Sequence, residues 1–385
     1  MGIRFYNLNG FFVKKLAHGV MNKNYIAGFG EAMLRLCPPG RKRFAQSLPG
    51  TLEATYGGGE ANVCASLAML GAKARCLTAL PPNPVAQAFA AELRGLGVDT
   101  TRINWKPQGR MGIYYVEHGA AQRGSNVVYD REGSTIALLA PEEYDFDAML
   151  EDVGHLHLTG ITPALSENAC RSTQVLAEAA AARGVTVSCD LNFRKKLWNW
   201  RPGTAPKELA AECMGKLVPL SDWIICNEED AADVFGIRSE AAEIEAGRLN
   251  AAGYREVAKH LLERFPKVSK VAVTLRESVS ADHNNWGAML FDREAGAFFA
   301  PLDAAGNYAP YEIRDIVDRF GGGDSFGAAL IYALYSDEYA EPQTAIRFAA
   351  AASCLKHSIP GDYNYSSRQE VAALMNGSGS GRVAR

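Results

Sequence analysis

Near its C-terminal end the chain reads Asp318-Arg319-Phe320-Gly321-Gly322-Gly323-Asp324-Ser325-Phe326-Gly327. Three consecutive glycines precede an acid, and apolar residues then follow at helical spacing, at Phe326, Leu330, Ala333 and Leu334. A glycine-rich turn that opens a helix points unpaired N–H groups outward, and the helix dipole adds partial positive charge. We therefore predict an anion site, and such sites most often hold phosphate. The alternative is a glycine loop that ends in an aspartate N-cap.

A second glycine turn lies far upstream. There the chain reads Gly57-Gly58-Gly59-Glu60-Ala61-Asn62 and continues as an alanine-rich helical stretch to Gly71, which is typical of a helix end. Asn62 falls in the first helical turn, where its amide would reach a ligand hydroxyl or cap the local backbone. An acid in a phosphate turn is useful where a hydroxyl attacks a phosphoryl group, because that reaction needs a base. Two such turns favour a functional site over a chance loop.

Composition limits the class of protein. The 385 residues suffice for a large core, in one α/β domain or two, and 48% hydrophobic with 22% charged residues is typical of a soluble globular chain. A net charge of -3 without a basic block gives no reason to expect nucleic-acid or membrane-surface binding. No apolar run reaches 18 residues, so we expect no transmembrane helix. Eight scattered cysteines without a C-x-x-C pair predict reduced thiols in a cytoplasmic protein.

Helical and apolar strand segments alternate through the middle of the chain. Predicted helix–strand pairs are 168–183 with 185–190, 206–217 with 223–226, and 250–264 with 271–275. This rhythm predicts parallel βα units. Polar residues gather where these strands end, and ligands of open α/β sheets bind at that edge. The polar residues are Asp190, Asn192, Arg194, Asn227 and Thr274.

We also make predictions for one central strand and for the two ends of the chain. His155 and His157 share one face of a predicted strand over 154–159, but no third metal ligand is apparent, so a structural role is favoured. Residues 1–23 lack a cleavage site and a long apolar segment, so we interpret them as an unstructured extension. The Gly-Ser-rich residues 376–385 are expected to form a flexible tail.

The two glycine turns resemble the signature motifs of a known protein family. Asp318 to Asp324 resembles the second signature of the ribokinase/PfkB carbohydrate kinases, D-T-x-G-A-G-D, and Gly57 to Gly71 resembles their first, G-G-x-x-x-N before an alanine-rich helix. The resemblance covers residues 24–375. It implies a ribokinase-like α/β three-layer sandwich with a mainly parallel central sheet. It also implies a small β-sheet lid, here expected from 33–56 and 108–135.

The chain departs from the family pattern at two places. Arg319 replaces the usual Thr, and Gly322 replaces the usual Ala. From Thr274 the family usually reads T-x-G-x-x-G. This chain has Arg276 where the pattern has its first glycine, and it has an insertion at 282–285. The nucleotide end of the site therefore differs more from the family pattern than the sugar end does.

Within the family the chain most resembles kinases of the sugar acid 2-keto-3-deoxygluconate, through residues 129–134, 157–166 and 190–198. The resemblance implies an ATP-dependent sugar-acid kinase. The substrate-binding residues that it implies are Gly58, Gly59, Asn62, Tyr114, Tyr129, Arg131, Arg194 and Asp324. The residues that it implies along ATP are Asn192, Asn227, Thr274, Arg276, Gly321 and Gly323.

The family resemblance also implies a mechanism. Asp324 would be the catalytic base, and the N–H groups of Gly321, Gly322 and Gly323 would stabilise the γ-phosphate oxygens. We expect the helix dipole to keep Asp324 ionised and weakly basic. Mg²⁺ would bridge the phosphates of ATP mostly through water, with indirect support from Asp230. The alternative for Asp230 is an ordinary acid in the first turn of a helix.

Several other interpretations stay open at this point. The nearest is another kinase of the family, acting on fructose or a nucleoside. A catalytically silent sugar-binding regulator is a second, although the acid at Asp324 argues against it. A nicotinamide dehydrogenase is disfavoured, because no G-x-G-x-x-G follows the first predicted strand. Free edges of a small lid sheet predict that two copies associate through the lid.

Overall fold

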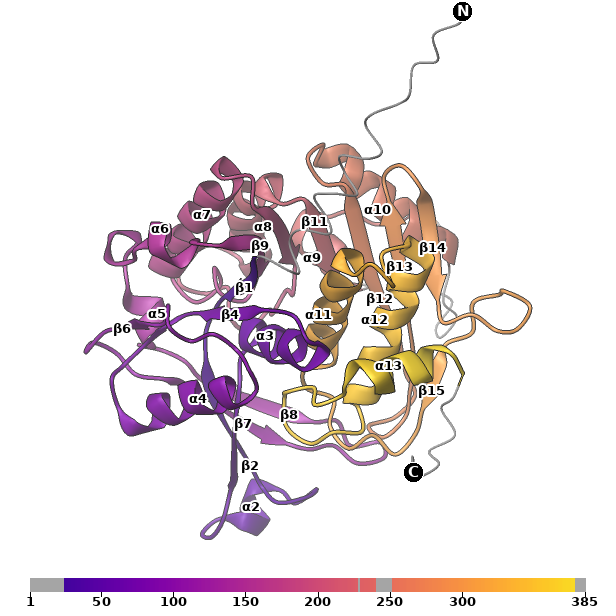
Figure 1. Cartoon of the computed structure of the whole chain (residues 1–385). Coiled ribbons are helices and arrows are strands. Elements are labelled where there is room, and N and C mark those ends of the chain that lie inside the picture. Colours follow the sequence, from indigo (N-terminus) through magenta and orange to yellow (C-terminus); the bar gives the residue numbers. More distant parts are fainter. Residues whose placement is uncertain (1–23, 228, 240–250, 378–385) are drawn as a thin grey trace, which may run out of the picture.

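A central mixed sheet runs through the computed structural model, which describes residues 24–227, 229–239 and 251–377 (Figure 1). Its strands are β1 (Tyr25–Phe29), β4 (Ala74–Leu77), β9 (Val153–Thr159), β10 (Thr186–Asp190), β11 (Trp223–Cys226), β12 (Lys270–Ser278), β13 (Asn284–Asp292), β14 (Gly296–Ala300) and β15 (Tyr311–Ile313). They lie in the order β14-β13-β12-β11-β10-β9-β1-β4, and β15 pairs with β13. The pairs from β4 to β12 are parallel, which confirms the predicted βα units. Strands β12, β13 and β14 pair antiparallel.

Helices cover both faces of this sheet. One group comprises α3 (Gly59–Leu70), α11 (Gly322–Tyr335), α12 (Pro342–Lys356) and α13 (Arg368–Met375). The other comprises α7 (Glu167–Ala182), α8 (Pro206–Leu217), α9 (Asp230–Phe235) and α10 (Ala251–Arg264). Adjacent strand residues point into different cores, because side chains alternate across a strand. Ile26 packs in the core under the first group, and Ala27 packs in the core under the second. The result is the predicted three-layer sandwich.

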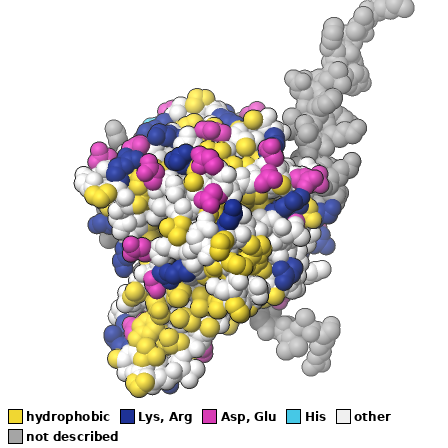
Figure 2. All heavy atoms as spheres, turned by 90° about the vertical axis from the view of Figure 1, so that its left-hand side faces the viewer, with side chains coloured by type: hydrophobic (Ala, Val, Ile, Leu, Met, Phe, Trp, Pro, Cys, Tyr) yellow, Lys and Arg dark blue, Asp and Glu magenta, His cyan; other side chains and the backbone are white. Residues whose placement is uncertain are grey.

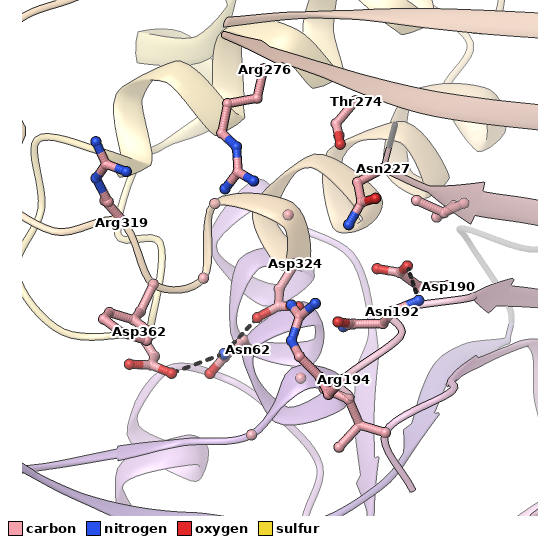
Figure 3. Close-up of a pocket in the computed structure, with 18 of the residues that line it drawn as sticks. Asn62, Asp190, Asn192, Arg194, Asn227, Thr274, Arg276, Arg319, Asp324 and Asp362 are labelled. Carbon is pink, nitrogen blue, oxygen red and sulfur yellow. Dashed lines mark hydrogen bonds between the residues drawn. The ribbon is translucent and has the colours of Figure 1, made fainter. Parts of the chain in front are cut away.

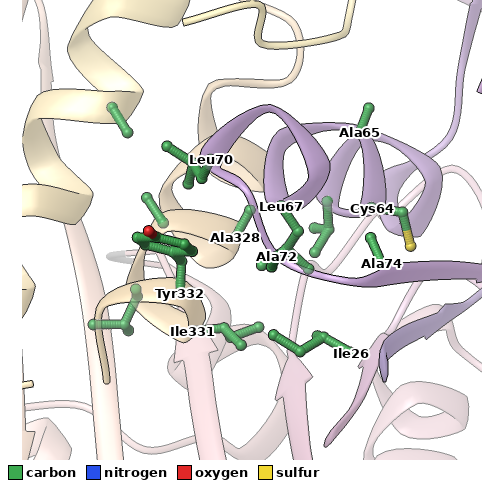
Figure 4. Packing of buried hydrophobic residues seen from close by; sticks show 14 of the residues in the cluster. Ile26, Cys64, Ala65, Leu67, Leu70, Ala72, Ala74, Ala328, Ile331 and Tyr332 are labelled. Atoms are coloured by element: carbon green, nitrogen blue, oxygen red, sulfur yellow. The ribbon is translucent and has the colours of Figure 1, made fainter. Parts of the chain in front are cut away.

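The two helices that begin with glycine turns pack against each other (Figure 4). Leu67 and Leu70 of α3 and Ala328, Ile331 and Tyr332 of α11 belong to one buried cluster. Small side chains such as Ala328 leave room for the neighbouring helix. Because the helices lie side by side, their N-terminal turns reach the same part of the molecule.

A separate small sheet contains four strands in the order β3-β2-β7-β8. They are β2 (Met33–Cys37), β3 (Glu53–Gly57), β7 (Gly112–Glu117) and β8 (Asn126–Asp130). These strands come from the two segments in which the small sheet was expected. Figure 1 shows the sheet below the central layers, with β2 projecting furthest.

The remaining elements are short, apart from α4. They are α2 (Phe44–Ser47), β5 (Ala79–Leu80), α4 (Pro84–Gly95), β6 (Asn104–Trp105), α5 (Thr135–Leu138), η1 (Pro141–Glu143), α6 (Phe146–Met149) and η2 (Val218–Leu220). The expected N-terminal extension, 1–23, and residues 378–385 of the expected tail lie outside the described residues. Within the described residues, no helix combines the length and apolarity that a membrane crossing requires.

The histidine pair on β9 has structural partners. His155 and His157 are both buried, and each ring contacts the hydroxyl of Ser188 on the adjacent strand, at 2.8 and 2.9 Å. His155 also contacts the hydroxyl of Tyr335 at 3.1 Å. Burial lowers the pKa of both rings, to about 4 for His157. The structure therefore favours the structural role expected for these histidines.

Candidate active site

A cavity of about 400 Å³ opens where the glycine turns, the ends of the parallel strands and the small sheet meet (Figure 3). Every residue that we predicted for the site from the sequence lines this cavity. These residues are Gly58, Gly59, Asn62, Tyr114, Tyr129, Arg131, Asn192, Arg194, Asn227, Asp230, Thr274, Arg276, Gly321, Gly322, Gly323 and Asp324. They come from both sheets and from both glycine-initiated helices, so the fold brings together segments that are far apart in the sequence.

The turn before α11 has the geometry of an anion site. Gly321 has φ of 76°, a left-handed conformation that favours glycine. A Cβ atom there would lie 1.9 Å from the carbonyl oxygen of Asp362, so the turn also needs the absence of a side chain. The N–H of Ser325 bonds to the carbonyl of Gly321 at 2.8 Å. The amides of Gly322, Gly323 and Asp324 therefore precede the helical ladder, where a helix offers N–H groups to an anion.

Asp324 lies in the first turn of α11, beside the N-terminal turn of α3. Its Oδ2 accepts a hydrogen bond from Nδ2 of Asn62 at 2.7 Å. Burial raises the pKa of Asp324 to about 6, against the lowering effect of the Asn62 hydrogen bond. The expectation of a weakly basic Asp324 was therefore wrong in direction, because loss of water outweighs the favourable dipole and hydrogen bond. A pKa near 6 leaves the group ionised at neutral pH and makes it a better base.

The side chain of Asn62 contacts two acids of the site. Its Nδ2 donates to Oδ2 of Asp324 and to Oδ2 of Asp362, the latter at 3.3 Å, and within the described residues it does not cap the local backbone. Its Oδ1 is buried and has no hydrogen-bond partner within the described part of the chain. A buried acceptor without a partner is costly, which suits a ligand that supplies a hydroxyl.

Arg131 is held by an acid that the sequence did not single out. It is 7% exposed, and its Nε donates to Oε2 of Glu31, which is 3% exposed. Among the described residues, Nη2 of Arg131 and Oε1 of Glu31 have no hydrogen-bond partner. The guanidinium therefore lines the cavity in a fixed orientation with one edge still available. The sequence offered one signal for this partner, an acid two residues after the end of β1, where Gly30 and Glu31 follow Phe29.

Arg194 differs from Arg131 in being exposed and close to several acids. It follows β10, and its Nη1 donates to the carbonyl of Phe193 at 3.2 Å. Its positive charge acts to lower the pKa values of Asp190, Asp230 and Asp324. In Figure 3 the guanidinium of Arg194 lies next to Asp324, while Arg276, Thr274 and Asn227 lie toward β11 and β12. The cavity thus has a part around the base and a part along the strand ends.

Asp230 has a local structural role. Its Oδ1 accepts from the N–H of Phe193 at 3.0 Å and its Oδ2 from the N–H of Asn227 at 2.9 Å. Asn227 in turn caps the start of α9, since its Oδ1 accepts from the N–H of Asp230 at 3.0 Å. The alternative of a first-turn acid is therefore supported. Asp190 lies nearby, and burial raises its pKa well above the usual range.

The acidic side chains of the cavity are few for a magnesium ion held by protein ligands alone. No group of three metal-ligating side chains is present among the described residues. Asp190 and Asp230 line the cavity, and each can accept a hydrogen bond from a metal-bound water. Such residues fit a metal ion that nucleotide phosphates hold and that the protein contacts through water.

The two departures from the family pattern contact each other. Arg319 donates to the carbonyl of Ala281 at 2.9 Å and to Oδ1 of Asn284 at 3.1 Å. It also donates to the carbonyl of Ser280. The long side chain at this position therefore connects the loop between β12 and β13, and Asn284 of the inserted segment, to the residues before the glycine turn. Burial and the nearby charge of Arg276 lower the pKa of Arg319.

Two further residues escaped the sequence analysis. Asp362 lines the cavity, and Arg35 lies behind it in β2. Nη1 of Arg35 donates to Oδ1 of Asp362 at 2.7 Å, and Nη2 donates to Oδ2 of Asp318 at 2.7 Å. Asp362 lies after a Pro-Gly pair, which indicates a turn but no chemistry.

Comparison with known proteins identifies the family of this chain. Residues 23–275 match the model of the pfkB family carbohydrate kinases. The 2-dehydro-3-deoxygalactonokinase of Haloferax volcanii is 30% identical over 353 residues, which cover 92% of this chain and 97% of that protein. The chain belongs to the PfkB family of carbohydrate kinases.

Other relatives agree with this assignment. The 2-dehydro-3-deoxygluconokinase of Thermoproteus tenax is 27% identical over 343 residues, covering 88% of this chain and 89% of the relative. The crystal structure of 2-dehydro-3-deoxygluconokinase from Thermotoga maritima superposes with a TM-score of 0.82 at 40% identity, covering 92% of this chain and 99% of that one. The fold and the family are thereby shown, and the protein is a carbohydrate kinase.

Proposed function

We propose that this carbohydrate kinase transfers the γ-phosphate of ATP to the 6-hydroxyl of a 2-keto-3-deoxy sugar acid, with 2-keto-3-deoxygluconate as the first candidate. The observation that carries this proposal is the pair of guanidiniums that line the cavity around Asp324, from Arg131 and Arg194. A guanidinium matches a carboxylate with paired, charge-assisted hydrogen bonds. Arg131 already pairs with Glu31, and its Nη2, which has no partner among the described residues, would supply these contacts together with Arg194.

The names of the relatives support a sugar acid as well. The Thermotoga maritima and Thermoproteus tenax proteins are named for 2-dehydro-3-deoxygluconate, which is another name for 2-keto-3-deoxygluconate. The Haloferax volcanii protein is named for the galactonate isomer. These two sugar acids share the keto acid group and differ in the configuration of one hydroxyl. The carboxylate contacts are therefore common to both candidates.

The sugar would lie between the small sheet and the base. Tyr114 and Tyr129 of the small sheet, Gly58, Gly59 and the free Oδ1 of Asn62 would contact its hydroxyl groups. Asp324 would accept the proton of the attacking hydroxyl. With a pKa of about 6, Asp324 is ionised at neutral pH and can take this proton as the oxygen attacks phosphorus.

The nucleotide would lie along the strand ends. Asn192, Asn227, Thr274 and Arg276 line that part of the cavity, and the amides of Gly321, Gly322 and Gly323 would donate to the γ-phosphate. Mg²⁺ bound to ATP would supply charge that offsets the phosphates, and Asp230 with Asp190 would orient its water ligands. The chain itself contributes positioning and fixed dipoles, which are the main protein contributions to phosphoryl transfer.

The direct test is an ATP-consumption panel with purified protein and Mg²⁺. The acceptors are 2-keto-3-deoxygluconate, 2-keto-3-deoxygalactonate, fructose, ribose and adenosine. We expect the two sugar acids to exceed every neutral acceptor in kcat/KM, with the product phosphorylated at the 6-hydroxyl. A preference for fructose or a nucleoside would reject the sugar-acid substrate while leaving the kinase family unchanged. Absence of turnover with every acceptor in the panel would support the silent regulator.

We also propose that two copies associate through the small sheet. Strands β3 and β8 are its edges, and Val128 of β8 is 51% exposed. Leu48, between α2 and β3, is 47% exposed. Figure 2 shows hydrophobic side chains gathered on the lower lobe, where β2 and α2 project. Sedimentation velocity at micromolar concentration should give a dimer, and a monomer across that range would reject this association.

A further inference from the structure

Arg35 is a fully buried charge in the small sheet, which is far in sequence from the catalytic turn. It is 1% exposed and forms ion pairs with Asp318 and Asp362, both at 2.7 Å. Its guanidinium also lies over the ring of Phe320, 4.9 Å from the centroid. Asp318 and Phe320 directly precede the glycine turn, and Asp362 comes from the loop between α12 and α13. A single side chain of the small sheet therefore joins both segments that frame the base.

The second carboxylate oxygen of Asp362 continues this connection to Asp324. Nδ2 of Asn62 lies 3.3 Å from Oδ2 of Asp362 and 2.7 Å from Oδ2 of Asp324. Asp318 also holds the backbone that leads into the glycine turn, since its Oδ1 accepts a hydrogen bond from the N–H of Phe320 at 3.0 Å. Its Oδ2 accepts from the N–H of Gly361 at 2.9 Å. Arg35 thus holds both the backbone entry to the glycine turn and the acid that shares Asn62 with the base.

We propose that Arg35 is a positioning residue for the phosphoryl-transfer step: it holds Asp318 and Asp362 and cancels their charge, so that Asn62 and Asp324 keep the arrangement the reaction needs. This inference rests on the proposed role of Asp324 as the base. It assigns the small sheet a second task besides contacting the sugar. Arg35 itself does not touch the reacting atoms.

The charges around the base explain why the loss of Arg35 would change the pKa of Asp324. The charged groups that act on Asp324 are Asp362 of the C-terminal loop, Arg194 after β10 and Lys356 of α12. Asp324 in turn acts on Asp190 of β10 and Glu60 of α3, so these acids face it as well. Asp362 raises the pKa of Asp324, whereas Arg194 and Lys356 lower it.

Removal of Arg35 takes the paired guanidinium away from Asp318 and Asp362, and the buried Lys356, on which both acids act, is left to offset their charge, with the ring of His118 at 4.0 Å from Asp318. An excess negative charge next to Asp324 disfavours its ionised form, so the pKa of Asp324 should rise further. The acid limb of the kcat–pH profile reports the ionisation of the base in the enzyme–substrate complex, and it should move to higher pH. A residue that only stabilised the fold would lower activity without moving this limb.

The experiment compares kcat and KM across pH 5–9 for wild type, Arg35→Met and Arg35→Lys. For Arg35→Met we expect kcat at pH 7 to fall ~10²-fold, since small misplacements near reacting groups have effects of that size. We expect the acid limb to move up by about one pH unit, since a nearby uncompensated charge shifts a pKa by that order. The loss should therefore be smaller at pH 9 than at pH 6. Arg35→Lys keeps the charge and should keep the limb in place.

Two further variants isolate the mechanism. In Arg35→Met/Asp362→Asn the uncompensated acid that acts on Asp324 is gone, although Asp318 remains, so the acid limb should return toward the wild-type position even though kcat stays low. The matched control is Arg75→Met, since Arg75 is also a buried arginine, 5% exposed and paired with Asp99 at 2.7 Å. Arg75 lies in β4 and does not line the cavity, so its loss should lower the melting temperature without moving the limb.

The outcome of this experiment is independent of the proposed substrate. The pH profiles are measured with whichever sugar the wild type phosphorylates best. A different substrate would therefore change the result of the acceptor panel but not the comparison of Arg35 variants with wild type. An Arg35→Met enzyme that loses activity equally at every pH, with its acid limb unmoved as expected for Arg75→Met, would overturn the positioning role. If Arg35→Met does not fold, Arg35→Gln decides in the same way, since it keeps hydrogen-bonding groups but not the charge.

Discussion

The amide of Asn62 donates to the carboxylate of Asp324 across 2.7 Å, although 262 positions separate the two residues. This hydrogen bond joins the first turn of α3 to the first turn of α11. The two glycine turns therefore form one site, because each helix brings its own N-terminal turn and one side chain to the same point. The position of the base is set by the packing of these helices and not by its own loop alone.

Asp324→Asn should remove the base and leave binding intact. We expect kcat to fall by roughly 10²–10⁴, the usual effect of a positioned base, with little change in the KM for ATP. Steady-state kinetics and a melting curve check this. Turnover within a few-fold of wild type in a folded variant would remove Asp324 from the catalytic role.

The pKa of Asp324 predicts opposite pH responses for activity and stability. Activity needs the ionised form, so kcat should rise with pH through about 6 and then level off. Burial raises the folded-state pKa above the ordinary value of 3.8, so the folded state binds this proton more tightly than the unfolded state does. The stability gained from that proton is complete below the ordinary value and is lost as pH rises through about 6.

Asp324→Asn should consequently be at least as stable as wild type at pH 8, and the difference should shrink at pH 5. Melting temperatures at both values test this directly. A variant that is clearly less stable than wild type at pH 8 would contradict the raised pKa.

Arg194→Ala tests the carboxylate contact. Loss of one charge-assisted contact is expected to cost about 1.5–3 kcal/mol, which lowers kcat/KM for the sugar acid by one to two decades. The KM for ATP should change little. Arg201→Ala is the matched control, because Arg201 pairs with Glu212 at 2.5 Å outside the cavity. Normal phosphorylation of the sugar acid by Arg194→Ala would reject the assignment of this arginine to the carboxylate.

The buried pair of Glu31 and Arg131 predicts a non-additive effect on stability. Removal of one partner of a buried ion pair leaves an uncompensated charge and typically costs about 3–5 kcal/mol. Glu31→Gln and Arg131→Met should therefore each lower the free energy of unfolding strongly. The double variant should be less unstable than the sum of the two, as urea titrations of all four proteins would show. Additive losses would mean that the two side chains do not depend on each other.

Gly321→Ala and Gly323→Ala form a matched pair within one turn. At Gly321 a methyl group would collide with the carbonyl of Asp362, and φ of 76° is unfavourable for alanine by about 1–3 kcal/mol. At Gly323 a Cβ atom would meet nothing within 4 Å. We expect a clear loss of melting temperature only for Gly321→Ala. Equal melting temperatures for both variants would show that the turn tolerates a different backbone.

Much of the site could be predicted from the sequence, because its decisive features are local. The glycines before Asp324 and before Asn62 encode tight turns at helix starts, and the apolar strands before Asp190 and Asn227 encode a parallel sheet. The C-terminal ends of parallel strands meet at one edge, so polar residues at those ends converge without knowledge of the packing. The candidates at these strand ends therefore line one cavity, and the packing of the small sheet and of the two glycine-initiated helices adds the others to it.

Only the tertiary structure decided how the charges of the site are balanced. Burial of Asp324 in the folded protein raises its pKa, whereas its own turn alone suggested the opposite. Arg131 pairs with Glu31, which is 100 positions away in the sequence, and Arg35 pairs with Asp362, which is 327 positions away. The energy of a charge depends on how much water is removed and on which opposite charge comes within a few ångströms. Both are set by contacts between distant segments, which residue patterns along the chain do not encode.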